Sequence, residues 1–253
     1  MPGKRALIAL LFLLTGCGGT VGGTVAASSP PGLPATPAAT ATPSASLTGP
    51  NLQGCYGPAD GRLFTYDGGG VMFDGLIMGD GPVGVVVSYE RGGDACTWRP
   101  LAERLTSAGY RVLLYERGLS GPVNPVIVKM TERLRKDGAE RIFLVGGSIG
   151  GSESIVAATR LKEPPEGVVN LAGTVIPEET APLTVPLLQI TAESDQGATP
   201  ITLQAAGDAA VKSPDRSLVV AKGEFAHASA LFGTAQGPMV LDSIMAFLAK
   251  HSG

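Results

Sequence analysis

The chain has 253 residues, of which 44% are hydrophobic and 16% charged. Its 19 basic and 22 acidic side chains give a formal net charge of −3, and this lack of a basic surplus argues against nucleic acid as a partner, which needs a clustered Lys/Arg field. Two His and three Cys are too few for a zinc module with regular ligand spacing, so we expect neither a metal nor a cofactor.

The N-terminus has the pattern of a secretory signal. Lys4 and Arg5 precede the apolar run Ala6–Leu14, which is far shorter than the ~20 residues of a membrane span. The tetrapeptide LTGC that follows resembles the lipobox of bacterial lipoproteins. That resemblance implies a signal peptide over residues 1–16, a lipid on the Cys17 sulfur and an extracytoplasmic, membrane-anchored protein in the cell envelope. The alternative is an ordinary signal peptide with an incidental Cys.

Residues 18–50 hold only Gly, Pro, Ala, Thr, Ser, Val and Leu. Such a segment buries too little apolar surface to offset its chain entropy, so residues 17–50 are predicted to be a lipid anchor and flexible linker. Residues 51–253 remain as one domain, whose 17 basic and 22 acidic side chains give a net charge of −5.

Within this domain, short apolar runs alternate with amphipathic segments. The expected strands are Arg62–Tyr66, Val71–Ile77, Val83–Ser88, Arg111–Tyr115, Arg141–Val145, Gly167–Leu171, Pro186–Thr191 and Ser217–Ala221. The expected helices are Pro100–Ala108, Asn124–Lys136, a segment reaching Arg160, and a last one containing Val240–Leu248. This alternation predicts an α/β fold with a mostly parallel central sheet and helices on both faces. Ligands then bind at the carboxyl ends of the strands.

A G-x-S-x-G motif occupies residues 146–150, directly after the strand RIFLV and before a helical run. In this context the motif places Ser148 on a tight strand-to-helix turn, where its hydroxyl stands clear of the sheet. We therefore predict that Ser148 is a nucleophile. The alternative is a Gly-rich turn that only packs helix against sheet.

A serine nucleophile needs a base, and a histidine base needs an acid to orient it. His227 follows the last expected strand, whereas His251 stands third from the end of the chain, where a solvated helix end is expected. His227 is therefore the predicted base. Glu193 and Asp195 both follow a strand, and Asp195 is preferred because it lies further past the strand end, with Glu193 as the reserve.

Four segments carry a resemblance to a known family. They are GGDACTWRPLAERLTSAGYRVLLYERG, RIFLVGGSIGGSESIVAA, PLLQITAESD and LVVAKGEFAHA, and together they resemble α/β-hydrolases, especially small bacterial members without a lid. The resemblance extends from Arg62 to the final helix. It implies acyl-enzyme chemistry with Ser148, Asp195 and His227 as nucleophile, acid and base, in the chain order typical of this class.

The same resemblance implies an oxyanion hole built from backbone N–H groups. One donor is Ile149, which follows the nucleophile, and the second is Glu90 or Arg91, of which we choose Glu90. Many relatives carry His-Gly where this chain has Ser88-Tyr89-Glu90. A carboxylate near the oxyanion opposes the developing charge, and this departure leaves open an inactive hydrolase-fold protein that serves as a binding or envelope module.

The remaining cysteines, Cys55 and Cys96, are an even pair in an oxidising compartment and are predicted to form a disulfide; two separate thiols are the alternative.

Only residues 172–185 separate two expected strands at the point where lids of this class are inserted, so no cap domain is expected. Trp98 is interpreted as a core anchor. The sequence thus predicts a lipid-anchored serine hydrolase acting on small or accessible acyl substrates. We choose a carboxylic-ester hydrolase, and the sequence leaves thioesters and amides open as alternative substrates.

Overall fold

The computed structural model describes residues 49–118 and 121–253. The predicted signal peptide, the predicted lipidation site Cys17 and the linker up to residue 48 lie outside the described residues. In the part of the chain that is described, none of the helices is both long and apolar enough to span a bilayer.

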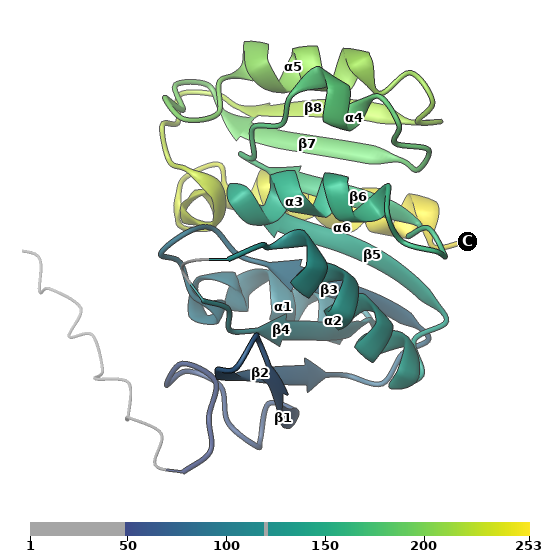
Figure 1. The fold of residues 1–253 in the computed structure, drawn as a ribbon. Helices are drawn as coiled ribbons and strands as arrows, with labels where there is room; N and C mark the ends of the chain where they lie inside the picture. The colour runs from purple at the N-terminus through teal and green to yellow at the C-terminus, as the bar shows by residue number, and fades with distance from the viewer. Residues whose placement is uncertain (1–48, 119–120) are drawn as a thin grey trace, which may run out of the picture. The chain divides into compact units, whose positions relative to one another are not determined.

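An eight-stranded sheet forms the centre of the described structure (Figure 1). Its strands are β1 (Arg62–Asp67), β2 (Met72–Met78), β3 (Val83–Ser88), β4 (Arg111–Tyr115), β5 (Arg141–Gly147), β6 (Gly167–Leu171), β7 (Leu187–Ala192) and β8 (Arg216–Ala221). Their spatial order is β1-β2-β4-β3-β5-β6-β7-β8. Strand β2 pairs antiparallel with both β1 and β4, and all pairings from β4 to β8 are parallel. The predicted α/β class with a mostly parallel sheet is confirmed.

Helices cover both faces of this sheet. Helices α1 (Arg99–Ser107) and α6 (Gly237–His251) pack on one face, and α2 (Asn124–Lys136), α3 (Ile149–Ala158) and α5 (Pro200–Ala209) pack on the other (Figure 1). Successive strand residues point to opposite faces, so β3 contributes to both sides. Val85 and Val87 join the apolar cluster under α1 and α6, whereas Val86 joins the cluster under α2 and α3. This is why β3 is an unbroken apolar run.

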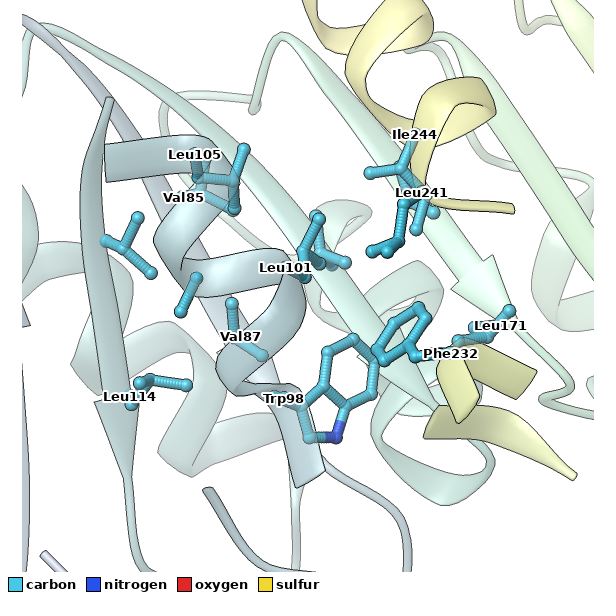
Figure 2. Packing of buried hydrophobic residues seen from close by; sticks show 14 of the residues in the cluster. Val85, Val87, Trp98, Leu101, Leu105, Leu114, Leu171, Phe232, Leu241 and Ile244 are labelled. Carbon is cyan, nitrogen blue, oxygen red and sulfur yellow. The ribbon is translucent and has the colours of Figure 1, made fainter. Parts of the chain in front are cut away.

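Trp98 anchors the first of these clusters. Its side chain is fully buried and meets the ring of Phe232 edge-on, with the ring centroids 5.3 Å apart. Figure 2 shows the two rings beside Leu101 of α1 and Leu241 of α6. The interpretation of Trp98 as a core residue is confirmed.

Four elements of the described structure were not predicted from the sequence: the 3₁₀ helices η1 (Ala95–Trp98) and η2 (Ala228–Gly233), the single turn α4 (Pro177–Thr180), and α5. Helix α5 has Thr199 as N-cap and Pro200 in its first turn, which are start signals. Its buried residues include the small Ala206 and Gly207, which give no strong apolar stripe, so the period was too weak to detect.

The order of strands reverses at β3 and β5. The chain leaves β3 through α1 to reach β4 on one side, and leaves β5 through α3 to reach β6 on the other. The two strands pair in parallel, with Ser88 opposite Gly146 at their carboxyl ends. Loops that leave a sheet in opposite directions open a crevice between them, and this position is the expected ligand site of such a fold.

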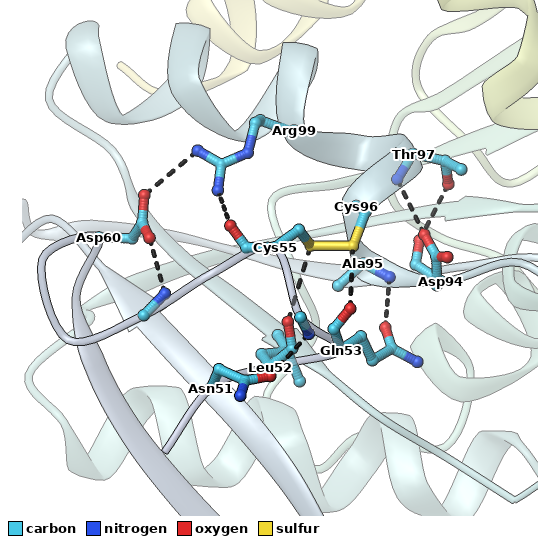
Figure 3. The surroundings of a disulfide bond; sticks show 12 residues. Asn51, Leu52, Gln53, Cys55, Asp60, Asp94, Ala95, Cys96, Thr97 and Arg99 are labelled. Carbon is cyan, nitrogen blue, oxygen red and sulfur yellow. Dashed lines mark hydrogen bonds and ion pairs between the residues drawn. A yellow bond between two sulfur atoms is a disulfide. The ribbon is translucent and has the colours of Figure 1, made fainter. Parts of the chain in front are cut away.

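Cys55 and Cys96 form a disulfide, as predicted (Figure 3). The bond joins the segment before β1 to η1. Beside it, the backbone N–H of Ala95 donates to Gln53 Oε1 over 2.6 Å, and Asp94 caps η1 by accepting from the N–H of Thr97. The start of the domain is thereby attached to the helix that follows the β3 loop.

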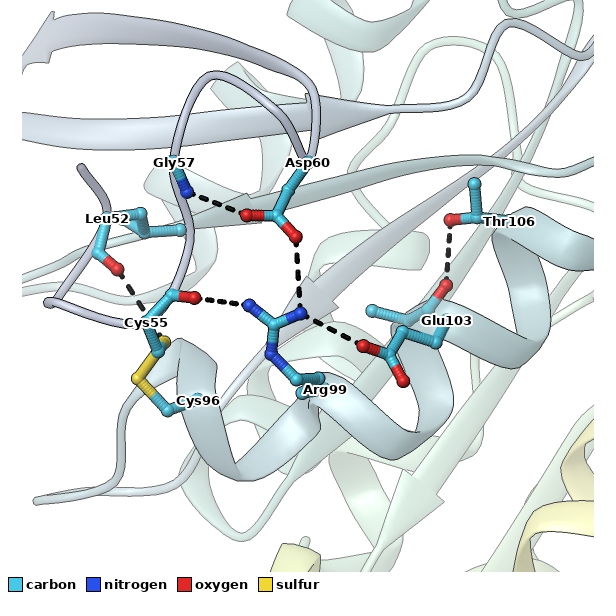
Figure 4. A network of polar contacts seen from close by, with 9 residues as sticks. Leu52, Cys55, Gly57, Asp60, Cys96, Arg99, Glu103 and Thr106 are labelled. Carbon is cyan, nitrogen blue, oxygen red and sulfur yellow. Dashed lines mark hydrogen bonds and ion pairs between the residues drawn. A yellow bond between two sulfur atoms is a disulfide. The ribbon is translucent and has the colours of Figure 1, made fainter. Parts of the chain in front are cut away.

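Arg99 reinforces this attachment (Figure 4). Its guanidinium donates to the carbonyl oxygen of Cys55, to Asp60 Oδ1 over 3.2 Å and to Glu103 Oε1 over 2.9 Å. It also stacks on the ring of Tyr56, 4.1 Å from the ring centroid. One side chain of α1 thus holds the segment that carries Cys55.

We expect loss of the disulfide to lower the free energy of unfolding by about 3 to 4 kcal/mol, because the bridge closes a loop between cysteines 41 residues apart. The measurement is urea unfolding of Cys55→Ser/Cys96→Ser, followed by circular dichroism and by the fluorescence of the single Trp98. Wild-type protein in excess reductant is the control and should unfold at the same urea concentration as the variant. Equal midpoints for the oxidised wild type and the variant would contradict the prediction.

Candidate functional site

Ser148 occupies the turn between β5 and α3. Its backbone has φ 50° and ψ −123°, a conformation that costs a non-glycine residue energy. The Ser148 N–H donates to the carbonyl oxygen of Leu171 over 2.8 Å, and its carbonyl accepts from the N–H of Ser152 over 3.0 Å. The side chain is partly exposed. This is the strained strand-to-helix turn that the G-x-S-x-G motif predicts.

The motif glycines allow a backbone contact that no side chain would permit. A Cβ atom on Gly150 would overlap the carbonyl oxygen of Ser88 at the end of β3, and one on Gly146 would overlap the backbone of Gly150. The first turn of α3 therefore lies directly against the ends of β3 and β5. This contact places the start of α3 at the carboxyl ends of two neighbouring parallel strands.

Asp195 and His227 form a hydrogen-bonded pair. His227 Nδ1 lies 2.7 Å from Asp195 Oδ2, and the backbone N–H groups of Gly197 and Ala198 donate to the other carboxylate oxygen over 2.8 and 3.0 Å. The Asp195 side chain is 2% exposed and that of His227 41% exposed. With Nδ1–H bonded to the carboxylate, the ring presents Nε2 as the free, basic nitrogen.

Glu193, the reserve acid, has other partners. Its carboxylate binds Lys222 Nζ over 2.9 Å and accepts from the N–H of Gly223 over 2.9 Å. The Lys222 hydrogen bond, followed by that of Gly223, lowers the pKa of Glu193. The structure therefore brings Asp195, and not Glu193, to His227.

His251 does not lie at a solvated helix end, and this expectation was wrong. Its side chain is only 17% exposed, its Nε2 lies 2.9 Å from Asp215 Oδ2, and its ring packs on Phe247 with centroids 4.8 Å apart. Lys250 binds the same carboxylate and is the main cause of the lowered pKa of Asp215. Proximity to the end of the chain misled the prediction, because the turn before β8 covers this end of α6.

The two predicted oxyanion donors lie after the carboxyl ends of β5 and β3. Ile149 is the first residue of α3, and Glu90 lies in the loop after β3, followed by Arg91 in the same turn. Among the described residues, neither the Ile149 nor the Glu90 N–H has a backbone or side-chain acceptor. The first N–H groups of a helix are free to bind an anion.

The carboxylate of Glu90 is held by two donors. Oε2 accepts from the indole N–H of Trp98 over 3.0 Å, and Oε1 accepts from the hydroxyl of Ser229 in η2. Both oxygens thus have protein partners, which accounts for a carboxylate in this loop. Neither the Trp98 nor the Ser229 partnership was predicted from the sequence, since all three residues come from different segments.

Asn170 is a further residue that sequence reasoning missed. It is fully buried at the end of β6, its Nδ2 donates to the carbonyl of Gly173 over 2.7 Å, and its Oδ1 accepts from the Gly173 N–H over 2.9 Å. Gly173 in turn packs against the carbonyl oxygen of Ser148. A polar residue inside the apolar strand GVVNL was the available signal. Within the described ranges, no three His, Cys, Asp or Glu side chains are grouped so as to hold a metal ion.

We expect Ser148→Gly to be more stable than Ser148→Ala by about 1 kcal/mol. Relief of the backbone strain at this position stabilises the glycine variant by about 1 to 3 kcal/mol. The greater flexibility of its unfolded chain destabilises it by about 0.5 to 1 kcal/mol. Urea unfolding of both variants is the measurement, and the alanine variant is the control because both lack the hydroxyl. An alanine variant as stable as the glycine variant would show that the turn is unstrained.

No protein-family model matches the sequence, and no curated protein matches it. Solved structures do match. An esterase from Pyrococcus furiosus superposes with a TM-score of 0.67 at 14% identity, over 81% of this chain and 97% of that one. A monoacylglycerol lipase from Paleococcus ferrophilus gives 0.62 at 16% identity, over 71% and 99%. A thermophilic esterase from Thermogutta terrifontis with propionate bound gives 0.62 at 15% identity, over 76% and 94%. The described chain therefore has the α/β-hydrolase fold, which esterases and lipases share.

Proposed function

We propose that this protein is an extracytoplasmic, lipid-anchored serine hydrolase that cleaves carboxylic esters through an acyl-enzyme. The observation that carries the proposal is the Asp195–His227 pair, buried on its acid side and accessible on its imidazole side, in the same fold as the strained Ser148 turn. The segments that carry His227 and Ser148 are adjacent, because a Cβ on Gly147 would lie 3.1 Å from that of Ala228.

In the proposed acylation, Ser148 Oγ attacks the ester carbonyl while His227 Nε2 takes its proton. The carbonyl oxygen becomes an oxyanion that accepts from the N–H groups of Ile149 and Glu90. Asp195 keeps the proton on Nδ1 and stabilises the imidazolium. His227 then protonates the leaving alcohol, and the acyl group remains on Ser148. A water molecule, deprotonated by His227, then attacks the acyl-enzyme and releases the carboxylic acid product.

The short connection between β6 and β7 supports a small or accessible acyl substrate. Between Leu171 and Leu187 the described chain contains only the four-residue α4, so this connection holds no cap domain. The Thermogutta terrifontis esterase, of the same fold, was solved with propionate, a short carboxylate, bound. We infer a comparably short acyl group for this chain.

The disulfide and the LTGC motif support the proposed location. A disulfide between Cys55 and Cys96 persists in oxidising compartments outside the cytoplasm. A lipid on Cys17 anchors the domain to a membrane through residues 18–50.

Labelling with a fluorophosphonate tests the proposed nucleophile. We expect one equivalent of label on Ser148, none in Ser148→Ala, and a rate lowered on the order of 10³-fold or more in His227→Ala, because the hydroxyl loses its base. The matched control is His251→Ala, which should label as the wild type does. A folded wild type that never labels would favour an inactive binding or envelope module. A panel of p-nitrophenyl esters, thioesters and peptides of increasing acyl length then identifies the bond cleaved.

Asp195→Asn and Glu193→Gln separate the two acid candidates. In Asp195→Asn the amide can still accept from Gly197 and Ala198, but its N–H₂ faces Nδ1 and drives the proton to Nε2, where the ring no longer acts as base. We expect kcat to fall on the order of 10³- to 10⁴-fold. Glu193→Gln, which loses only an exposed ion pair, should stay within about twofold. The reverse ranking in an ester hydrolysis assay would exclude Asp195 as the acid.

A further inference from the structure

Three segments that are distant in sequence meet at the Glu90 carboxylate. The loop after β3 contributes Glu90, η1 contributes the Trp98 indole N–H at 3.0 Å, and η2 contributes the Ser229 hydroxyl. Trp98 is fully buried and Ser229 is 3% exposed. The contact therefore joins the loop after β3 to buried residues of both η1 and η2.

This junction lies against the nucleophile turn. A Cβ on Gly147, the residue before Ser148, would lie 2.7 Å from the Trp98 ring, 2.9 Å from Glu90 Oε2 and 3.1 Å from the Cβ of Ala228. Gly147 is thus surrounded by the three segments.

The junction also fixes the turn that carries the imidazole. Ala228, directly after His227, is fully buried with a positive φ of 50°, which costs a non-glycine residue energy. Such a turn persists only when its surroundings hold it. The residues that follow supply two such contacts: Ser229 donates to Glu90, and the ring of Phe232 meets that of Trp98 edge-on. Figure 2 shows Phe232 and Trp98 face to edge in the core.

We propose that the Glu90 side chain is a positioning residue that holds the His227 turn and the β3 loop against the nucleophile turn. The proposal rests on the proposed function for its catalytic consequence. Glu90 acts through Ser229 and Trp98 and does not touch the substrate with its carboxylate. Its own N–H is the second oxyanion donor, so one residue aligns the donor and the base together. Both partners are neutral donors, so a neutral acceptor of the same shape can still contact both, and we expect hydrogen-bond geometry to carry the effect.

The variants Glu90→Ala, Glu90→Gln and Ser229→Ala distinguish geometry from charge. Glutamine has the same shape, and its oxygen can accept from Trp98 while its N–H₂ donates to the Ser229 hydroxyl. Alanine removes both contacts, and Ser229→Ala removes one of them without touching the β3 loop. Glu163→Ala, which loses only a surface pair with Arg135, is the control. Urea unfolding of each variant shows that it is folded, and Ser229→Ala maintains the test if Glu90→Ala does not fold.

Two readouts are used. In hydrolysis of a short p-nitrophenyl ester, we expect Glu90→Ala to lower kcat on the order of 10- to 100-fold with KM little changed, and Glu90→Gln to recover most of that loss. The double variant Glu90→Ala/Ser229→Ala should be no slower than Glu90→Ala, because the two residues act through one contact. In protein labelled with ¹³C at histidine, which has only His227 and His251, Glu90→Ala and Ser229→Ala should shift the His227 ring signal and leave His251 in place.

Equal losses in Glu90→Gln and Glu90→Ala would overturn the proposal, because the charge would then be responsible. So would a folded Glu90→Ala or Ser229→Ala protein with an unmoved His227 signal. The ring signal does not require turnover, so the two proposals fail separately. Suppose that the wild type neither hydrolyses esters nor takes up label, while the His227 signal still moves in Glu90→Ala and Ser229→Ala. That result would support the positioning contact and reject the proposed hydrolase activity.

Discussion

The backbone contact between the ends of β3 and β5 and the first turn of α3 is the constraint on which the site is built. Gly150 touches the carbonyl oxygen of Ser88 at a distance that excludes any side chain. This contact holds α3 close to the sheet where the strand order reverses. Ser148, two residues before Gly150, has a positive φ. The Ser148 turn is strained where the helix starts close to the strands.

Contacts on both sides of the turn hold this strain. On the β6 side, the Leu171 carbonyl binds the Ser148 N–H, and the buried Asn170 fixes the loop at Gly173 that packs on the Ser148 carbonyl. On the β3 side, the junction at Glu90 packs against Gly147. Strain of this kind is found at functional sites and is maintained by well-packed surroundings, here two independent polar networks.

The disulfide connects the stability of the domain to the same region. Cys96 lies in η1, two residues before Trp98, and Arg99 secures the opposite side of the disulfide at the Cys55 carbonyl. The N-terminal segment is therefore fixed to the short helix that presents the indole to Glu90. The beginning of the described domain thus supports the loop after β3.

Local patterns in the sequence were sufficient for the sheet, the main helices and the position of Ser148. Unbroken apolar runs predict buried parallel strands, and the glycines around Ser148 predict a tight turn because close backbone approach excludes side chains at those positions. The pairing of Cys55 with Cys96 followed from counting. Distance from the strand end was also enough to prefer Asp195 over Glu193. Patterns of this kind are local, so they could not place His251 against Asp215 or find α5 behind its small residues. Only the tertiary structure decided these, because each depends on which segments the crossovers bring together. Asp195 meets His227 across the loops after β7 and β8, while Glu193, two residues earlier, pairs with Lys222. Glu90 is the clearest case: the sequence marks it as an unusual charge, and its two neutral partners come from segments that only folding places beside it.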